Sequence, residues 1–173
     1  MENTKITLES LNKGGLSEFV GALGDVFENC PWLVARTSSA RPFHTKEALI
    51  AALLDEMKAL SREEKLQLLR AHPDLAGKAA RTGKLTKHST REQKSAGLDQ
   101  LSKNEFFRFE RLNKAYQKRF GFPFIIAVSD HSKESIFSSF ETRLGSSQNV
   151  QIEEALKNIG RIVSLRIKDV MEK

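Results

Sequence analysis

Apolar residues recur every three or four positions along most of this chain, a spacing that places them on one face of an α-helix. The longest stripe lies near the C-terminal end, and an earlier one ends near residues 29–31. We find no internal repeat, low-complexity tract or Pro/Gly-rich linker. The pattern predicts an all-α fold in which residues 1–173 form a single domain of about seven or eight helices. The two stripes comprise Leu16, Phe19, Val20, Leu23, Val26 and Phe27, then Ile152, Leu156, Ile159, Val163, Ile167 and Val170.

Residues that cap a first helical turn predict where the other helices begin. Thr45 is expected to precede one helix, and either Asp130 or Ser132 another. A Ser with Glu three residues later is typical of a capping box, and this pattern occurs three times. The boxes are Ser61–Glu64, Ser89–Glu92 and Ser102–Glu105. The predicted inward residues are Leu49, Ala52, Leu53 and Leu60; Leu66 and Leu69; Phe106, Phe109, Leu112, Tyr116 and Phe120; and Ile136, Phe137 and Phe140.

The connections between these helices are predicted from glycine, proline and polar residues. Residues 76–88 contain two glycines and many polar residues, which indicates a loop. Gly121 is expected to end the helix before it, since glycine readily adopts the left-handed conformation of a helix end. The short apolar run from Phe122 to Val128 suits a buried strand or an extended loop. A polar connection over residues 145–151 leads to the last helix.

The length and the ends of the chain bear on its class and location. A chain of 173 residues suits one domain with a real core. No apolar run approaches the roughly 20 residues that cross a bilayer, so we expect no membrane partner. Residues 1–5 lack the basic and apolar segments of a signal peptide, and Met171–Lys173 is not a peroxisomal address. The cytoplasm is therefore the expected location.

The charged residues and the single cysteine limit the partners and cofactors. The formal net charge is +6, and nucleic acid is one interpretation of such a surplus. The basic residues are nevertheless spread among acidic ones, and even the densest stretch, Lys78 to Lys94, suits a solvated face or a surface that attracts a small anion. Cys30 alone forms no internal disulfide or thiolate metal cluster. Among the histidines, no pair has the helical i, i+4 spacing of a zinc site, so we expect no metal.

Arg166 lies at or beside the apolar stripe of the last helix, because Ile162, Val163 and Val170 are its helical neighbours. In one interpretation its stem covers the core while its guanidinium reaches water. In the other, the planar, permanently charged group binds a carboxylate or urea oxygen. Arg161 falls on a different face and is expected to be solvated.

His72 and Pro73 form a second candidate site. Proline disfavours the helical conformation of the residue before it, so His72 is expected at a helix end. Histidine exchanges protons near neutral pH, although an ordinary helix-end histidine explains the same pattern. Ser89, Glu92 and Gln93 have two compatible interpretations. They form a capping box, and the helix N-terminus they mark also suits a polar ligand.

Residues 122–128 are either plain core or a segment whose backbone groups contact a flat ligand with amide-like edges. No glycine-rich phosphate loop, dinucleotide fingerprint or nucleophile elbow is present. The residues alone therefore predict a helical domain with a possible site built from His, Glu and Arg.

These motifs resemble the 2-oxo-4-hydroxy-4-carboxy-5-ureidoimidazoline (OHCU) decarboxylase family. The similarity runs along nearly the whole chain, with six motifs in the same order as in the family and a match in the last helix. The matching stretches are Asn29–Trp32, Ala40–Phe43, Ala71–Lys78, Ser89–Gln93, Ser95–Leu98, Arg119–Ile126 and Ile159–Ile167.

The resemblance implies an all-α enzyme, usually a homodimer, without a metal or organic cofactor. It implies the last step of urate breakdown, in which a small-molecule substrate, OHCU, loses CO2 to give (S)-allantoin. His72 matches the family's catalytic histidine and Glu92 its partner carboxylate. The substrate-binding positions implied by the family are Pro73, Ser89, Gln93, Phe124, Ile125, Ile126, Ala127, Val128 and Arg166.

The implied chemistry suits these residue types. Loss of CO2 leaves electrons that must move into the imidazoline C=N system, and Arg166 with N–H donors would stabilise that charge. The substrate carbon must then be protonated on one face, and His72 is the natural acid–base group. Whether His72 also assists substrate ionisation stays open. The alternatives are a basic helical module without enzymatic activity, a relative that has lost activity, and a lyase or hydrolase for another ureido compound.

Overall fold

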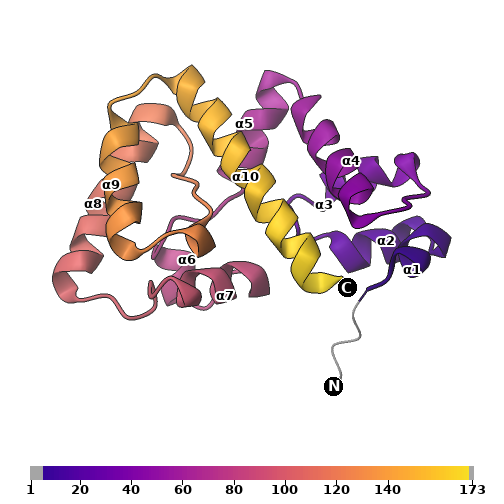
Figure 1. The fold of residues 1–173 in the computed structure, drawn as a ribbon. Coiled ribbons are helices and arrows are strands. Elements are labelled where there is room, and N and C mark those ends of the chain that lie inside the picture. The colour runs from indigo at the N-terminus through magenta and orange to yellow at the C-terminus, as the bar shows by residue number, and fades with distance from the viewer. Residues whose placement is uncertain (1–5, 172–173) are drawn as a thin grey trace. The chain divides into compact units, whose positions relative to one another are not determined.

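The structure is a computed structural model that describes residues 6–171. The described residues exclude 1–5, 172 and 173. Most of the predictions about targeting concern these excluded residues. Ten α-helices and two short 3-10 helices, η1 and η2, dominate the described chain and confirm the all-α prediction (Figure 1). Eight of the ten have at least seven residues, and three of the ten, α1, α3 and α6, fall outside the helices that the sequence predicts. No helix within residues 6–171 is long and apolar enough to cross a membrane.

The chain divides into two compact units, one with residues up to Lys65 and from Gly160 onward, the other with Leu66–Ile159. Helix α5 (Arg62–Arg70) and helix α10 (Gln148–Val170) each contribute residues to both units. The single domain over residues 1–173 stays a prediction.

The first unit is built from the chain's two ends. Its complete helices are α1 (Leu8–Lys13), α2 (Leu16–Leu23), α3 (Pro31–Thr37), η1 (Ser38–Ala40) and α4 (Lys46–Lys58), and α3 packs against both α2 and α4. Helix α2 ends at Leu23, several residues earlier than its apolar stripe predicts. Gly24 is the C-cap residue of α2, and glycine costs about 1 kcal/mol in a helix relative to alanine. Val26 and Phe27 nevertheless reach the core from the following turns.

Two of the predicted helix starts in this unit are confirmed. Thr45 caps α4 by accepting a 3.0 Å hydrogen bond from the Ala48 N–H. Ser61 and Glu64 form a reciprocal capping box at the start of α5, with bonds of 3.2 and 3.0 Å. The backbone N–H of Ser61 and the Arg36 guanidinium together lower the pKa of Glu64 below its usual 4.5.

The second unit contains α6 (Lys78–Arg81), α7 (Lys87–Ser95), α8 (Lys103–Phe120), η2 (Val128–Asp130), α9 (Lys133–Leu144) and the first half of α10. The loop predicted over residues 76–88 therefore includes one short helix, and α10 begins within the predicted polar connection. Ser102 and Glu105 form the predicted capping box of α8. Gly121 ends α8 with the left-handed φ of 80°, and Ser132 rather than Asp130 caps α9.

An aromatic core lies between α8 and α9, which pack against each other. Tyr116 on α8 is fully buried and its ring lies within 6.2 Å of four phenylalanine rings. Aromatic pairs at such distances stabilise a core beyond simple burial. Those rings belong to Phe120, Phe122, Phe124 and Phe140.

Candidate active site

His72 lies just beyond the C-terminal end of α5, as its position before proline predicts. Its backbone N–H donates a 3.3 Å hydrogen bond to the carbonyl of Leu69 in the last turn of the helix. The side chain is half-buried, and its Nε2 atom is buried. Four residues further on, Ala76 adopts a positive φ of 50°, which non-glycine residues rarely do. The segment that follows His72 therefore turns sharply before α6.

Two amide side chains hold the backbone of this segment in place. Gln93 on α7 accepts a 3.0 Å hydrogen bond from the Ala76 N–H through its Oε1. Asn113 on α8 donates a 2.8 Å bond from its Nδ2 to the Leu75 carbonyl. Both amides are at least 94% buried, so the bonds are shielded from water.

A third amide acts nearer to His72. Gln117, one turn after Asn113 on α8, donates a 2.6 Å hydrogen bond from Nε2 to the Asp74 carboxylate. Sequence reasoning missed both α8 amides, because polar residues on an amphipathic helix normally face solvent. The available signal is that Asn113 falls within the buried stripe of α8, between Phe109 and Tyr116.

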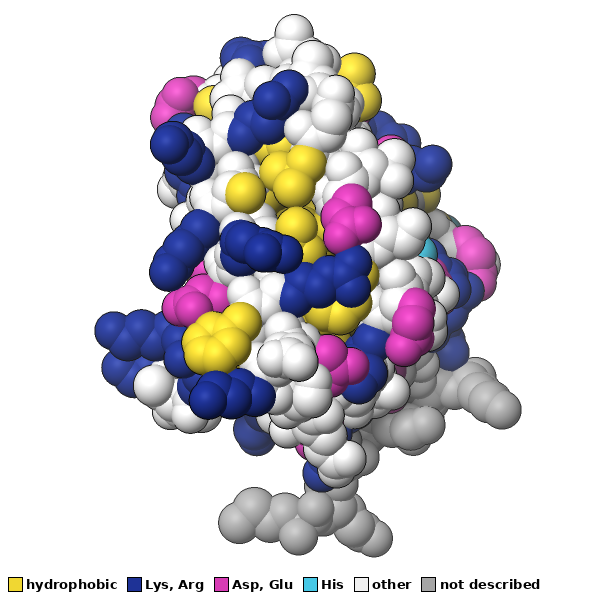
Figure 2. Space-filling model, turned by 90° about the vertical axis from the view of Figure 1, so that its left-hand side faces the viewer, with side chains coloured by type: hydrophobic (Ala, Val, Ile, Leu, Met, Phe, Trp, Pro, Cys, Tyr) yellow, Lys and Arg dark blue, Asp and Glu magenta, His cyan; other side chains and the backbone are white. Residues whose placement is uncertain are grey.

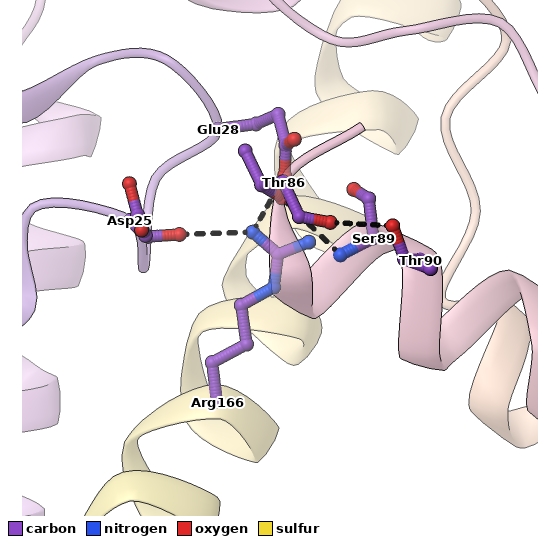
Figure 3. Close-up of polar contacts among 6 residues, drawn as sticks. All are labelled: Asp25, Glu28, Thr86, Ser89, Thr90 and Arg166. Atoms are coloured by element: carbon purple, nitrogen blue, oxygen red, sulfur yellow. Dashed lines mark hydrogen bonds and ion pairs between the residues drawn. The ribbon is translucent and has the colours of Figure 1, made fainter. Parts of the chain in front are cut away.

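Helix α7 begins one turn earlier than its apparent capping box. Thr86 is the N-cap residue, and its Oγ1 accepts a 3.2 Å hydrogen bond from the Ser89 N–H (Figure 3). The Thr90 hydroxyl also donates to the Thr86 carbonyl, at 2.9 Å. The predicted capping box of Ser89 and Glu92 is therefore wrong, because an earlier Thr provides the cap. Neither side chain is needed to start this helix.

The side chains of α7 differ in how far they are buried. Ser89 and Gln93 are separated by one helical turn and both are about 6% exposed, so they lie on the buried face of the helix. Glu92 is half-buried beside them. A short polar side chain at a buried helix position is unusual, and such positions often serve binding or catalysis.

The segment from Phe124 to Val128 is buried throughout. It forms no strand pairing in the described structure, so of the two predicted forms the strand is excluded. Two side chains hold its backbone instead. Arg143 donates a 2.7 Å hydrogen bond from Nη1 to the Ile125 carbonyl, and Asn158 accepts a 3.1 Å bond from the Ala127 N–H. Helix η2, which begins at Val128, packs against α7.

The second unit thus contains most of the predicted site residues. Helix α7 holds the segment after His72 through Gln93, and it packs against the helix that ends the buried segment. The predicted residues in this unit are His72, Pro73, Ser89, Glu92, Gln93 and Phe124 to Val128.

Two cavities open in this unit, and they share no lining residue. A cavity of about 340 Å³ is lined by His72, Pro73, Asp74, Gln117 and neighbouring residues. A larger cavity of about 650 Å³ lies along α6, α7 and the start of α8, with Gln93 at its wall. The volume of each is sufficient for a small organic molecule. His72 and Gln93 therefore line different cavities.

Arg166 belongs to the first unit, and its guanidinium is buried, at 3% exposure. The Nη1 atom donates to the Glu28 carboxylate at 2.8 Å and to the Asp25 carbonyl at 3.1 Å (Figure 3). The interpretation in which the guanidinium reaches water is therefore wrong. Glu28, which sequence reasoning missed, is 1% exposed. Arg161 is exposed, as predicted.

The described residues contain no group of three or more His, Cys, Asp or Glu side chains arranged to hold a metal ion. Cys30 is buried, and burial raises the pKa of its thiol above the usual 9.0. A thiol with a raised pKa is a weak nucleophile at neutral pH.

The comparisons with known proteins identify the family to which the chain is similar. A family described as OHCU decarboxylase matches residues 12–168, which reach into both units. A protein of Haloferax volcanii named 2-oxo-4-hydroxy-4-carboxy-5-ureidoimidazoline decarboxylase is 38% identical over 165 residues, covering 95% of this chain and 96% of its own.

Two solved structures have a similar fold. A structure of (S)-allantoin synthase superposes with a TM-score of 0.77 and 25% identity over 96% of this chain, which spans about half, 54%, of that protein. A structure of OHCU decarboxylase in the presence of (S)-allantoin gives a TM-score of 0.71 at 20% identity. The match covers 92% of this chain and 100% of that one, and it supports the fold. With a family match over nearly its full length, this chain belongs to the OHCU decarboxylase family.

Proposed function

We propose that this chain removes CO2 from OHCU and releases (S)-allantoin, the last step of urate degradation. The observation that carries the proposal is the position of His72 at the end of α5, before a segment whose backbone and side chains are held by three amides. Hydrogen bonds with Gln93, Asn113 and Gln117 hold the residues after it. A catalytic group needs such support, because a small displacement costs a large part of the rate.

In the proposed reaction, His72 is the acid–base group and Glu92 is its partner carboxylate. The carbon–carbon bond to the carboxylate breaks, CO2 leaves, and the bonding electrons move into the C=N system of the ring. A C=C bond thus forms between the two ring carbons while the nitrogen of the former C=N bond takes a proton. His72 then gives a proton to one face of the ureido-bearing carbon, which sets the handedness of the product, and the hydroxyl of the decarboxylated carbon loses its proton and becomes the carbonyl. The half-buried Glu92 would orient the imidazole, in the manner of the carboxylate in other histidine pairs.

The remaining predicted residues would bind the substrate. Pro73, Ser89 and Gln93 would contact it with Phe124, Ile125, Ile126, Ala127 and Val128, which offer backbone as well as apolar groups. Arg166 would stabilise the charge that develops as CO2 leaves. None of these roles needs a metal or an organic cofactor. The same proposal describes a cytoplasmic homodimer, so light scattering should give twice the 19.5 kDa mass of one chain.

Circular dichroism tests the reaction directly, because a single enantiomer of allantoin is optically active. Urate is oxidised immediately before the measurement, and the protein is then added to the short-lived intermediates. We expect a faster signal of (S)-allantoin than in the protein-free sample, which forms allantoin of both hands. An identical time course with and without the protein would refute the proposed function.

The second candidate is a basic helical module that binds nucleic acid. The face of the molecule in Figure 2 shows Lys and Arg side chains interspersed with Asp and Glu around a band of hydrophobic side chains. Nucleic-acid binding favours a continuous basic surface and falls steeply with added salt. A salt-dependent shift of duplex DNA or RNA, without any effect on allantoin formation, would favour this candidate.

A further inference from the structure

Arg143 on α9 is buried, and each of its three guanidinium nitrogens faces an acceptor. The Nη1 atom donates to the Ile125 carbonyl at 2.7 Å and Nε donates to Gln151 Oε1 at 2.8 Å. The Nη2 atom lies 3.5 Å from the hydroxyl of Tyr116. Tyr116 in turn donates a 2.8 Å hydrogen bond to the same Gln151 oxygen. The three acceptors are thus tied into one network, and all of them are neutral.

Burying a guanidinium among neutral acceptors in a protein core costs free energy. Removing a cation from water is unfavourable, and well-packed apolar side chains often replace a buried ionic group without loss of stability. Burial lowers the pKa of Arg143 below its usual value, as expected when a charged group is removed from water. The presence of the charge therefore suggests a role beyond stability.

The network ends on the segment that we propose for substrate binding. The guanidinium contacts the Ile125 carbonyl and also lies over the ring of Phe124, 4.3 Å from its centroid. The same ring stacks on Phe140 at 3.7 Å. Arg143 therefore holds two successive residues of the segment, one by its backbone and one by its side chain.

Asn158 holds the segment two residues further on. Its Nδ2 donates to the Glu154 carbonyl at 2.9 Å and lies 3.3 Å from the Glu154 carboxylate, which turns Oδ1 towards the Ala127 N–H. Phe124, Ile125 and Ile126 make no backbone–backbone hydrogen bond within the described chain. Side chains rather than secondary structure thus determine the shape of this segment.

We propose that Arg143 and Asn158 are positioning residues for the reaction. They fix the Ile125 carbonyl and the Ala127 N–H, and thereby hold residues 124–128 in the shape that binds the substrate. The inference rests on the proposed function. It predicts that loosening either side chain weakens substrate binding more than it slows the chemistry, because a separate set of amides holds the residues that follow His72.

The test compares KM and kcat of four variants with the wild type. Arg143→Lys keeps the charge but loses the planar group that binds several acceptors at once, and Asn158→Ala removes the acceptor for Ala127. We expect each to raise KM about tenfold while kcat stays within about threefold, the pattern of lost substrate binding. Two matched controls alter residues next to Arg143 and Asn158 and leave these two residues unchanged. Tyr116→Phe leaves the Arg143–Ile125 bond, and Glu154→Gln leaves the Asn158–Ala127 bond, so both should keep the wild-type KM.

The outcomes separate this inference from the proposed function. If the wild type does not accelerate allantoin formation, the function fails and the inference falls with it. If the wild type is active but Arg143→Lys and Asn158→Ala keep its KM, only the inference is refuted. Equal KM increases in the controls would also refute it, since they would show a general loss of packing. Should Arg143→Lys fail to fold, an unchanged KM in Asn158→Ala is sufficient to overturn the proposal.

Discussion

At the scale of single residues, His72 is the side chain whose replacement tells most about the chemistry. We expect His72→Ala and His72→Asn to fold normally, because the bonds that hold this segment come from residues 74–76. Loss of a general acid typically costs about 10²–10⁴ in rate. Circular dichroism should then show little excess of (S)-allantoin beyond the spontaneous reaction.

His44 provides the matched control for His72. It is exposed, belongs to the first unit and lies outside the stretches that match the family. His44→Ala should keep the wild-type rate and handedness of the product. Near-wild-type output from either His72 variant would contradict the assigned role.

Arg166 combines a buried ion pair with a proposed role in catalysis, and the choice of variant separates them. Removing one partner of a buried pair typically costs about 3–5 kcal/mol, so Arg166→Met should destabilise the protein strongly. Arg166→Lys keeps a positive charge opposite Glu28 but loses the planar group. We expect the lysine variant to stay folded in a urea titration and to lose most of its activity. Full activity in that variant would leave Arg166 with a structural role only.

At the scale of the helices, the sequence predicted those with a cap signal or a long apolar stripe, such as α4, α8 and α10. It missed α6, because a helix of four residues has too few positions to show a period. It misplaced the start of α7, because Ser89 and Glu92 have the capping spacing while Thr86 provides the cap.

The corrected start of α7 gives predictions for two caps and for one serine that is not a cap. Thr86→Ala and Ser102→Ala each remove an N-cap and should lower the free energy of unfolding by about 1 kcal/mol. Ser89→Ala removes no capping side chain, and we expect it to raise KM. Urea unfolding and steady-state kinetics distinguish the two effects. A Ser89→Ala variant with a normal KM and the stability loss of a lost cap would restore the capping interpretation.

The capping box of α8 also predicts a pH dependence. The Ser102 N–H, and after it Lys133, lower the pKa of the Glu105 carboxylate below 4.5. The contribution of this carboxylate is therefore present above pH 4.5 and is lost as the pH falls through the lowered pKa. Glu105→Gln should melt at a lower temperature than the wild type at neutral pH. The difference should shrink on acidification, and a constant difference down to the acid transition would contradict the assignment.

The polar partners of the site show why sequence reasoning could predict it only in part. His72 and Gln93 belong to motifs that are visible in the sequence. Arg143 and Asn158 do not, because their significance depends on which backbone groups they meet in the folded chain. Glu28 and Arg166 are 138 positions apart, so neither predicts the other by spacing.

At the scale of the whole molecule, the second unit is one continuous stretch, whereas the first needs both ends of the chain. Contacts between distant positions form slowly, because chain entropy must be lost before they stabilise anything. We expect residues 66–159 to gain protection first in pulse-labelling hydrogen exchange during refolding. Earlier protection of α2 and α3 than of α8 and α9 would contradict this order.

The amides around the segment after His72 have a consequence for how the enzyme responds to acid and alkali. Gln93 and Asn113 contact peptide groups only, and neither amides nor peptides gain or lose protons in the range where proteins stay folded. The support they give is therefore the same at every working pH. A bell-shaped rate profile would then report ionisable groups elsewhere, and not a loosening of these two hydrogen bonds.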